Sequence, residues 1–135
     1  MATLHLFRGH PGSGKTTAAY RMFPGIFHVE NDMYVMRDNK YEWSKDTVKD
    51  SIDWCISMVR NALEHGFDVV VANTFTKRRY IEAYKKIAEE YGANFDVHRC
   101  VGNFQNAHGL NSKMVDSFIK AMEDWPGEHL VNPTI

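Results

Sequence analysis

The apolar residues of this chain fall into two patterns. Four short runs of mostly apolar residues have the length of β-strands and lie at residues 4–7, 26–29, 69–72 and 95–101. Around them, apolar residues recur every three or four positions, as on one face of an α-helix, and polar residues 37–42 predict a loop. The third run reads Val-Val-Val-Ala, which is typical of a strand buried on both faces of a parallel sheet. Strands and helices are therefore expected in alternation.

Four helices are expected between and after these strands. The clearest one follows Ser44, a suitable N-cap, and ends at Gly66, because glycine favours the left-handed conformation of a helix C-terminus. The others cover residues 16–22, a segment closed by Gly92, and a segment around residues 114–122. The apolar stripe of the first helix consists of Val48, Ile52, Cys55, Ile56, Val59 and Leu63.

A glycine-rich segment follows the first strand. Residues 9–16 read Gly-His-Pro-Gly-Ser-Gly-Lys-Thr and fit the P-loop motif GxxxxGK[ST], between a strand and a helix as the motif requires. Its glycines let backbone N–H groups converge on an anion, and the helix N-terminus adds its dipole. Lys15 supplies positive charge to the β and γ phosphates, and the Thr16 hydroxyl is a ligand for Mg²⁺. We expect a nucleoside triphosphate to bind here, with magnesium. The predicted nucleotide-binding residues are Gly9, Pro11, Gly12, Ser13, Gly14, Lys15, Thr16 and Thr17.

The motif and the alternation together predict an α/β fold. We expect the three-layer sandwich of P-loop NTPases, with a mostly parallel four-stranded sheet flanked by helices. The length of 135 residues predicts a single domain, residues 1–135, without repeats or an internal linker.

Two carboxylates follow the second strand, in the sequence Glu30-Asn31-Asp32. Chemistry in an open parallel sheet takes place beyond the carboxyl ends of the strands. Asp32 is therefore a candidate general base for an attacking hydroxyl and, with Thr16, a candidate magnesium ligand. Glu30 is a rival for the role of base, and a helix cap is the alternative role of Asp32.

Candidate substrate contacts follow the third strand. Asn73 and Thr74 are placed to hold substrate or a metal-bound water, or to form a turn. Arg78 and Arg79 belong to a basic cluster at the start of a helix, where cations oppose the helix dipole. This cost favours an anionic ligand such as a substrate phosphate, and a solvated surface is the alternative.

Composition narrows the class of protein. Sixteen Lys and Arg residues against seventeen Asp and Glu residues give a formal charge of −1, which neither requires nor excludes a nucleic-acid ligand. No apolar run reaches the roughly 18 residues of a membrane span, and residues 1–7 are too short for a secretory signal.

The cysteine and histidine positions predict no special chemistry. Cys55 and Cys100 are expected to be buried free thiols, which predicts a reducing, cytoplasmic setting. No spacing of His, Cys and Asp predicts a zinc site. His5, His28 and His98 lie in strand segments, where hydrogen-bonded roles are expected.

Three segments together resemble the 5′-kinase domain of bacteriophage polynucleotide kinase. They are residues 8–17, the sequence His-Val-Glu-Asn-Asp at residues 28–32, and the sequence Val-Ala-Asn-Thr-Phe-Thr-Lys-Arg-Arg at residues 71–79. The similarity covers about 100 residues. It implies a four-stranded parallel sheet, ATP and Mg²⁺ as cofactors, and transfer of the γ-phosphate to a 5′-hydroxyl of nucleic acid. It also implies that Lys15 and Asp32 are catalytic, with Asp32 as the general base.

The chain departs from that family at three places. Val35 stands where the family has an arginine, which leaves the nearby Arg37 as a candidate substrate contact. Asn73-Thr74 replaces Asp-Thr, and residues 103–113, which correspond to the arginine-rich lid, contain no arginine. Loss of a phosphate-clamping arginine costs roughly 10³ to 10⁵ in rate.

Three functions remain open on these grounds. The first is an ATP-dependent kinase with a polynucleotide 5′-hydroxyl as the leading acceptor, either slow or completed by Arg99 or by a partner's arginine. The second is a kinase for a nucleoside, sugar or antibiotic. The third is a nucleotide-binding switch or adaptor without turnover.

Overall fold

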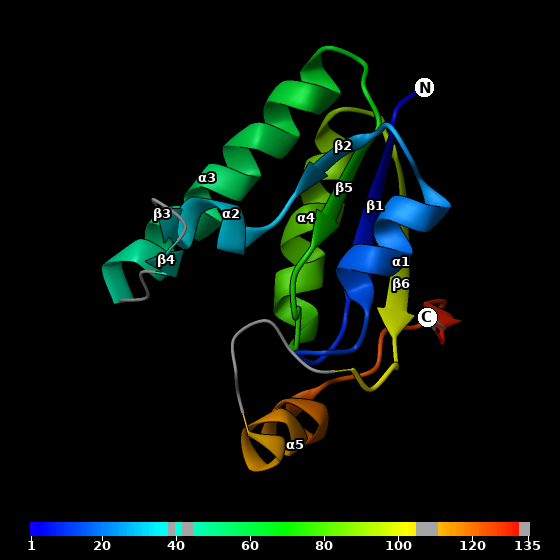
Figure 1. The fold of residues 1–135 in the computed structure, drawn as a ribbon. Coiled ribbons are helices and arrows are strands. Elements are labelled where there is room, and N and C mark those ends of the chain that lie inside the picture. Colours follow the sequence, from blue (N-terminus) through cyan, green and yellow to red (C-terminus); the bar gives the residue numbers. More distant parts are fainter. Residues whose placement is uncertain (38–39, 42–44, 105–110, 133–135) are drawn as a thin grey trace.

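The computed structural model describes residues 1–37, 40–41, 45–104 and 111–132, without the side chains of residues 35–37, 40–41 and 45. Strands and helices alternate along it, as the sequence predicts (Figure 1). The elements are β1 (Thr3–Arg8), α1 (Lys15–Met22), β2 (Phe27–Val29), α2 (Asn31–Val35), β3 (Met36–Arg37), β4 (Lys40–Tyr41), α3 (Lys45–Glu64), β5 (Val69–Ala72), α4 (Arg78–Glu90), β6 (Asn94–Cys100), α5 (Ser112–Ala121) and β7 (His129–Val131).

The central sheet has five strands in the order β2-β5-β1-β6-β7, and all its pairs are parallel. The predicted α/β class with a helix-flanked parallel sheet is confirmed, and the predicted number of four strands is wrong. The fifth strand, β7, has only three residues and pairs with β6 from His98 to Cys100. A segment of three residues is too short to form a recognisable apolar run. Its pairing also depends on β6, which is distant in the sequence.

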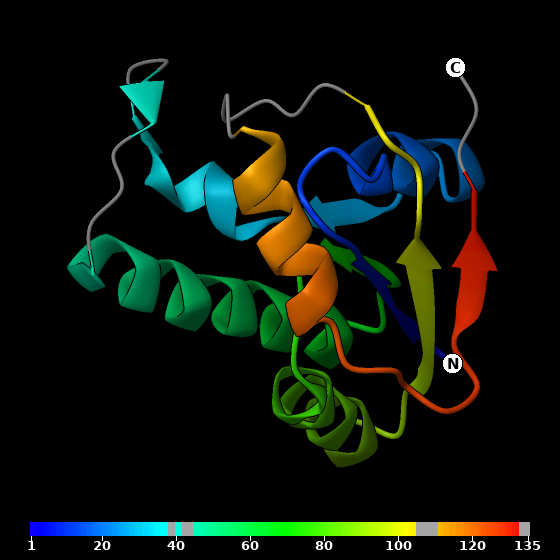
Figure 2. The same ribbon diagram turned by 90° about the horizontal axis from the view of Figure 1, so that it is seen from below.

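Helices cover both faces of the sheet. Helices α3 and α4 lie on one face and α1 lies on the other, while α5 lies beyond the end at which β1 and β6 finish (Figures 1 and 2). No described helix is both long and apolar enough to cross a membrane.

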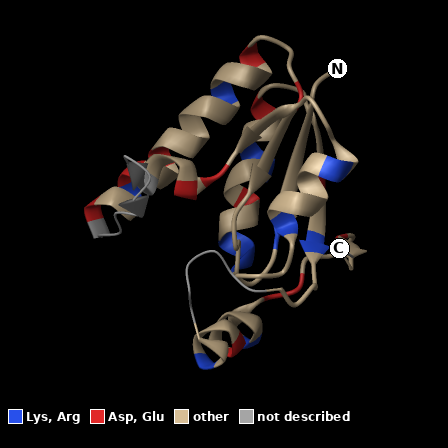
Figure 3. Ribbon diagram, viewed as in Figure 1, with Lys and Arg blue, Asp and Glu red and all other residues tan. Residues whose placement is uncertain are grey.

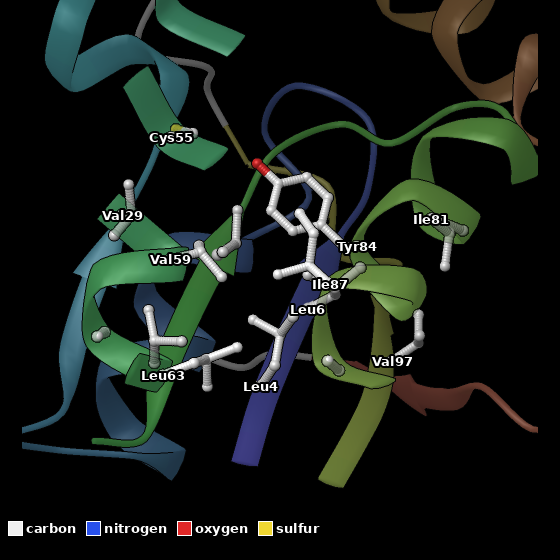
Figure 4. Close-up of a cluster of buried hydrophobic side chains, with 14 of the residues drawn as sticks. Leu4, Leu6, Val29, Cys55, Val59, Leu63, Ile81, Tyr84, Ile87 and Val97 are labelled. Carbon is white, nitrogen blue, oxygen red and sulfur yellow. The ribbon is translucent and has the colours of Figure 1, made fainter. Parts of the chain in front are cut away.

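The core lies mainly between the sheet and the α3–α4 layer (Figure 4). Leu4 and Leu6 of β1 are fully buried there against side chains of both helices. On the opposite face, Phe7 packs with Ala18 and Ala19 of α1. Alternate residues of β1 thus face the two helical layers, so the strand that leads into the glycine-rich segment is held rigidly from both sides. The core residues on the α3–α4 face include Val29, Cys55, Val59, Leu63, Val69, Val71, Ile81, Tyr84, Ile87 and Val97.

The segment between α2 and α3 differs from the expected loop. Met36–Arg37 and Lys40–Tyr41 pair as a short antiparallel sheet. Two-residue strands show no detectable alternation of apolar and polar residues, which explains why the sequence does not predict them. Ser44, the expected N-cap of α3, lies outside the described residues.

Candidate functional site

The P-loop joins β1 to α1 and leaves the N-terminus of that helix open. Gly14 is the N-cap in a left-handed conformation (φ 88°), and no side chain caps the helix. A residue with a Cβ is strained at this φ, so glycine is required for this turn. The N–H groups at the start of a helix have no partner within the helix, and Lys15, Thr16 and Thr17 form this first turn. The loop therefore presents donors and a positive dipole end to an anion.

Lys15 and two carboxylates meet at this opening. Burial lowers the pKa of Lys15, and the carboxylates of Glu30 and Asp32 counteract the effect. The hydroxyl of Thr16 donates a hydrogen bond to Glu30 Oε2 at 3.0 Å. The side chains of α1 and of the segment that leaves β2 thus converge, as expected for the carboxyl end of a parallel sheet.

The sequence predicts Asp32 beside Thr16 as the second magnesium ligand, but Glu30 is the carboxylate that is hydrogen-bonded to Thr16. Besides the Thr16 hydroxyl, Glu30 Oε2 accepts a hydrogen bond from His28 Nε2. The His28 ring in turn stacks on Tyr20 of α1, with ring centroids 4.2 Å apart. Asp32 lies half-buried in the first turn of α2. The signal for Glu30 is present in the sequence, since this carboxylate follows β2 directly, but nothing in the sequence shows which carboxylate faces Thr16.

Asn73 joins the carboxyl ends of two neighbouring strands. Its side-chain oxygen accepts from the backbone N–H of Asn31 at 2.9 Å, and its amide donates to Asn31 Oδ1 at 3.1 Å. This pair holds the start of α2, which contains Asp32, against the end of β5. The carbonyl oxygen of Thr74 accepts from the N–H of Gly9 at 3.3 Å, so Asn73 and Thr74 both position the site.

The segment after β6 fixes the P-loop from the other side. Gly102 N–H donates to Ser13 O at 3.0 Å, and Phe104 N–H donates to Gly12 O at 2.7 Å. His10 Nε2 donates to Gly102 O at 2.8 Å, and burial lowers the pKa of His10, which favours its neutral form. A Cβ at Gly102 would lie 2.6 Å from Ser13 O, so only glycine allows this approach. These contacts hold the P-loop against the segment that follows β6.

A family comparison matches this same part of the chain. The model of the family described as AAA domain matches residues 4–103, which include the P-loop, Glu30, Asp32 and Asn73. The chain belongs to the AAA domain family. The predicted P-loop of this AAA domain thus lies within the residues that match the family model.

Relatives and solved structures support the same fold. An uncharacterized protein of Pasteurella multocida (strain Pm70) is 27% identical over 93% of this chain and 79% of its own length. A sugar kinase from Janibacter sp. HTCC2649 is 16% identical with a TM-score of 0.66, covering 98% of this chain and 85% of that chain. A chain of the Pnkp1/Rnl/Hen1 complex is 18% identical with a TM-score of 0.64, covering 86% of this chain but only 38% of that chain. The AAA domain therefore has the fold of P-loop kinases.

The arginines of the AAA domain near this edge are held by other protein groups. Arg8 is fully buried and donates to Phe75 O, Glu123 O and, at 2.7 Å, to Glu128 Oε1. Arg99 binds the carboxylate of Asp124 at 2.6 Å.

Two of the predicted substrate contacts, Arg78 and Arg79, are engaged by other protein groups. Arg78 donates to Asp124 O at 2.7 Å, and Arg79 lies over the ring of Tyr80, 5.0 Å from its centroid. The Arg37 side chain lies outside the described residues, as does most of the lid segment, residues 105–110. Substrate contact by these three arginines stays a prediction.

The oxygen groups of the site suit a hard divalent cation. The Thr16 hydroxyl and the carboxylates of Glu30 and Asp32 are the ligand types that Mg²⁺ prefers. Figure 3 shows that acidic positions lie along the segment after β2, on α2 and at the start of α3. These carboxylates would hold Mg²⁺ beside the triphosphate, where the ion would neutralise developing negative charge.

Proposed function

We propose that this AAA domain is an ATP-dependent kinase that transfers the γ-phosphate to a hydroxyl group. The observation that supports this is the open N-terminus of α1, with the Lys15 ammonium and the oxygens of Glu30 and Asp32 at the same opening. A polyphosphate satisfies both the unpaired helix donors and the desolvated ammonium.

The roles of the residues follow from this arrangement. Lys15 neutralises the β and γ phosphates, and Thr16 with Glu30 forms the metal side of the site. The oxygen of the acceptor hydroxyl forms a bond to the γ-phosphorus while Asp32 accepts the proton of that hydroxyl. At the same time the bond from the γ-phosphorus to the bridging oxygen of ADP breaks. His28 orients Glu30 through its hydrogen bond.

The leading acceptor is a polynucleotide 5′-hydroxyl. This choice rests on the resemblance of residues 8–17, 28–32 and 71–79 to the 5′-kinase domain of bacteriophage polynucleotide kinase. The likeness in fold to a chain of the Pnkp1/Rnl/Hen1 complex is consistent with it. In this proposal Lys77, Arg78 and Arg79 approach the nucleic-acid phosphates.

A small hydroxylated acceptor is the second candidate. Arg8, Arg78 and Arg99 are engaged by protein groups, and Lys15, the cation beside Asp32, is assigned to the triphosphate. Such surroundings suit the hydroxyls of a sugar or nucleoside better than a polyanion, because nucleic-acid binding depends on cations at the phosphates. The likeness to a sugar kinase over 98% of this chain agrees with this candidate.

Label transfer from ATP distinguishes the candidates. The protein is incubated with γ-labelled ATP, Mg²⁺ and separate acceptors: 5′-hydroxyl DNA and RNA oligonucleotides, nucleosides and sugars. We expect transfer to one class, and a loss of at least about 100-fold in Asp32→Asn if this residue is the base. Glu64→Gln, an exposed carboxylate at the end of α3, should retain full activity.

The other outcomes are equally informative. Transfer only to sugars or nucleosides would replace the polynucleotide acceptor with the second candidate. ATP binding that requires Lys15, without transfer to any acceptor, would show a nucleotide-binding switch and overturn the kinase proposal.

A further inference from the structure

A cluster of His5, Asp96 and His98 lies on the neighbouring strands β1 and β6 of the sheet. We propose that these three side chains bind a zinc ion. The cluster is independent of the proposed kinase site, and the spacing of its residues in the sequence does not predict it.

The register of the sheet brings the three residues together. His5 on β1 stands opposite Asp96 on β6, and His98 follows Asp96 by two residues, on the same face of the strand. The imidazole of His5 is stacked on Phe23 just after α1, with centroids 3.9 Å apart. The His98 ring is stacked on Phe7, with centroids 4.6 Å apart. Aromatic packing thus fixes both imidazoles before any ion binds.

The candidate ligand atoms of the three residues lie close together. His5 Nδ1 lies 2.8 Å from Asp96 Oδ1, and His98 Nε2 lies 3.1 Å from the same oxygen. The candidate ligand atoms of all three residues lie within 4.8 Å of one another. Bonds of about 2.0–2.2 Å to tetrahedral zinc place ligand atoms about 3.3–3.5 Å apart. The two contacts to Asp96 are shorter than this spacing, so the Asp96 carboxylate would have to move away from the imidazoles to admit the ion.

The donor set favours zinc over magnesium. Two imidazole nitrogens and one carboxylate oxygen are typical zinc ligands, whereas Mg²⁺ prefers oxygen ligands alone. The two histidines are buried, while the Asp96 side chain is 31% exposed and leaves an entry route from solvent. The ring of His129 on β7 lies 5.2 Å from that of His98.

A hydrogen-bonded triad without metal is the alternative for these residues. In that state both imidazoles donate to Asp96. Desolvation raises the pKa of Asp96, but the hydrogen bonds from His5 and His98 outweigh it and hold that pKa below its ordinary value. The triad leaves His98 Nδ1 buried and without a hydrogen-bond partner among the described residues. The hydrogen bond to Asp96 uses Nε2 of His98, and a metal ion would replace that hydrogen bond at the same nitrogen.

Metal titration of the full chain tests the proposal. After chelator treatment and without nucleotide, zinc is added in a calorimeter, and cobalt(II) is added in parallel as a spectroscopic probe. We expect one zinc per chain and visible absorption bands of tetrahedral cobalt. Asp96→Asn and His98→Gln should each weaken zinc binding at least about tenfold, because each removes a ligand.

Two control variants test whether other histidines or carboxylates of the chain bind the zinc. His65→Gln removes an exposed histidine at the end of α3, and Glu30→Gln removes a carboxylate of the P-loop site. Both should bind zinc as the unaltered protein does. Equal zinc affinity in Asp96→Asn and His98→Gln, loss of binding in Glu30→Gln, or no zinc binding in the micromolar range would each overturn the proposal. If either ligand variant fails to fold by circular dichroism, a cobalt spectrum of the unaltered protein without tetrahedral bands overturns it.

Discussion

The side chain of Lys15 is partly buried, and burial disfavours its charged form until an anion binds. Burial lowers the pKa of Lys15 below its ordinary value of 10.5, and Glu30 and Asp32 offset this only in part. A bound triphosphate brings further negative charge and raises the pKa again. Binding therefore takes up protons wherever the pH lies between the pKa of the free protein and that of the complex.

The affinity for ATP should consequently fall as the pH rises through the pKa of Lys15 in the free protein. Below that pKa the lysine is already charged, so the affinity should be constant. Calorimetry at about pH 8 to about pH 10, in buffers of different ionisation enthalpy, measures both the affinity and the protons taken up. Lys15→Arg should bind more weakly but without this decline, because guanidinium stays charged. A flat profile for the unaltered protein would contradict the assignment.

Single residues differ in how far the sequence reveals their roles. Lys15 and Thr16 are recognisable because a local motif defines their surroundings. Glu30 and Asp32 are both visible as candidates, but their division of labour depends on side-chain directions and on the bond from His28. The pairing of Asn31 with Asn73 could not be predicted, since it requires β2 to lie beside β5.

At the level of elements, a buried ion pair fastens the C-terminal segment to the end of β1. The side chains of Arg8 and Glu128 are 0% and 9% exposed, and burial lowers the pKa of Arg8 while Glu128 counteracts this. Glu128→Gln removes the negative charge and leaves the buried guanidinium with the carbonyl oxygens of Phe75 and Glu123 but without its ion-pair partner. We expect the free energy of unfolding to fall by about 3–5 kcal/mol, measured by urea denaturation.

An exposed ion pair serves as the control for this effect. Arg60 of α3 and Glu90 of α4 form a bridge of similar length, 2.6 Å, but their side chains are 40% and 53% exposed. Glu90→Gln should leave the unfolding curve almost unchanged, because solvent screens such pairs. Equal effects of Glu128→Gln and Glu90→Gln would show that burial of the Arg8 pair contributes nothing.

The elements themselves could be predicted to different degrees. The strand Val69–Ala72 has the predicted bounds, because its continuous apolar run reflects burial on both faces. The positive φ of Gly66 and Gly92 likewise agrees with the helix ends expected there. By contrast, β7 depends on hydrogen bonds to β6, and the order β2-β5-β1-β6-β7 depends on which distant strands pair. Local patterns contain no information about such partners.

For the whole molecule, the P-loop is the point at which separate parts of the fold are joined. It continues β1, begins α1 and is hydrogen-bonded to Gly102 and Phe104 after β6, while Glu30 reaches Thr16 from β2. A ligand that holds the loop therefore opposes unfolding of the sheet as a unit, because it binds only when these strands are in place.

Nucleotide should accordingly raise the melting temperature of the entire chain. At a concentration of about 100 times Kd, a ligand of the native state stabilises it by about 2.7 kcal/mol, which corresponds to a shift on the order of 10 °C for a chain of this size. Scanning calorimetry with Mg²⁺ and ATP, GTP or ADP measures the shift and the base preference together. Lys15→Ala should abolish the shift while melting as one transition at a similar temperature without ligand. If no nucleoside triphosphate shifts the transition of the unaltered protein, the open helix end and its lysine do not form a phosphate site, and the proposed kinase activity fails with them.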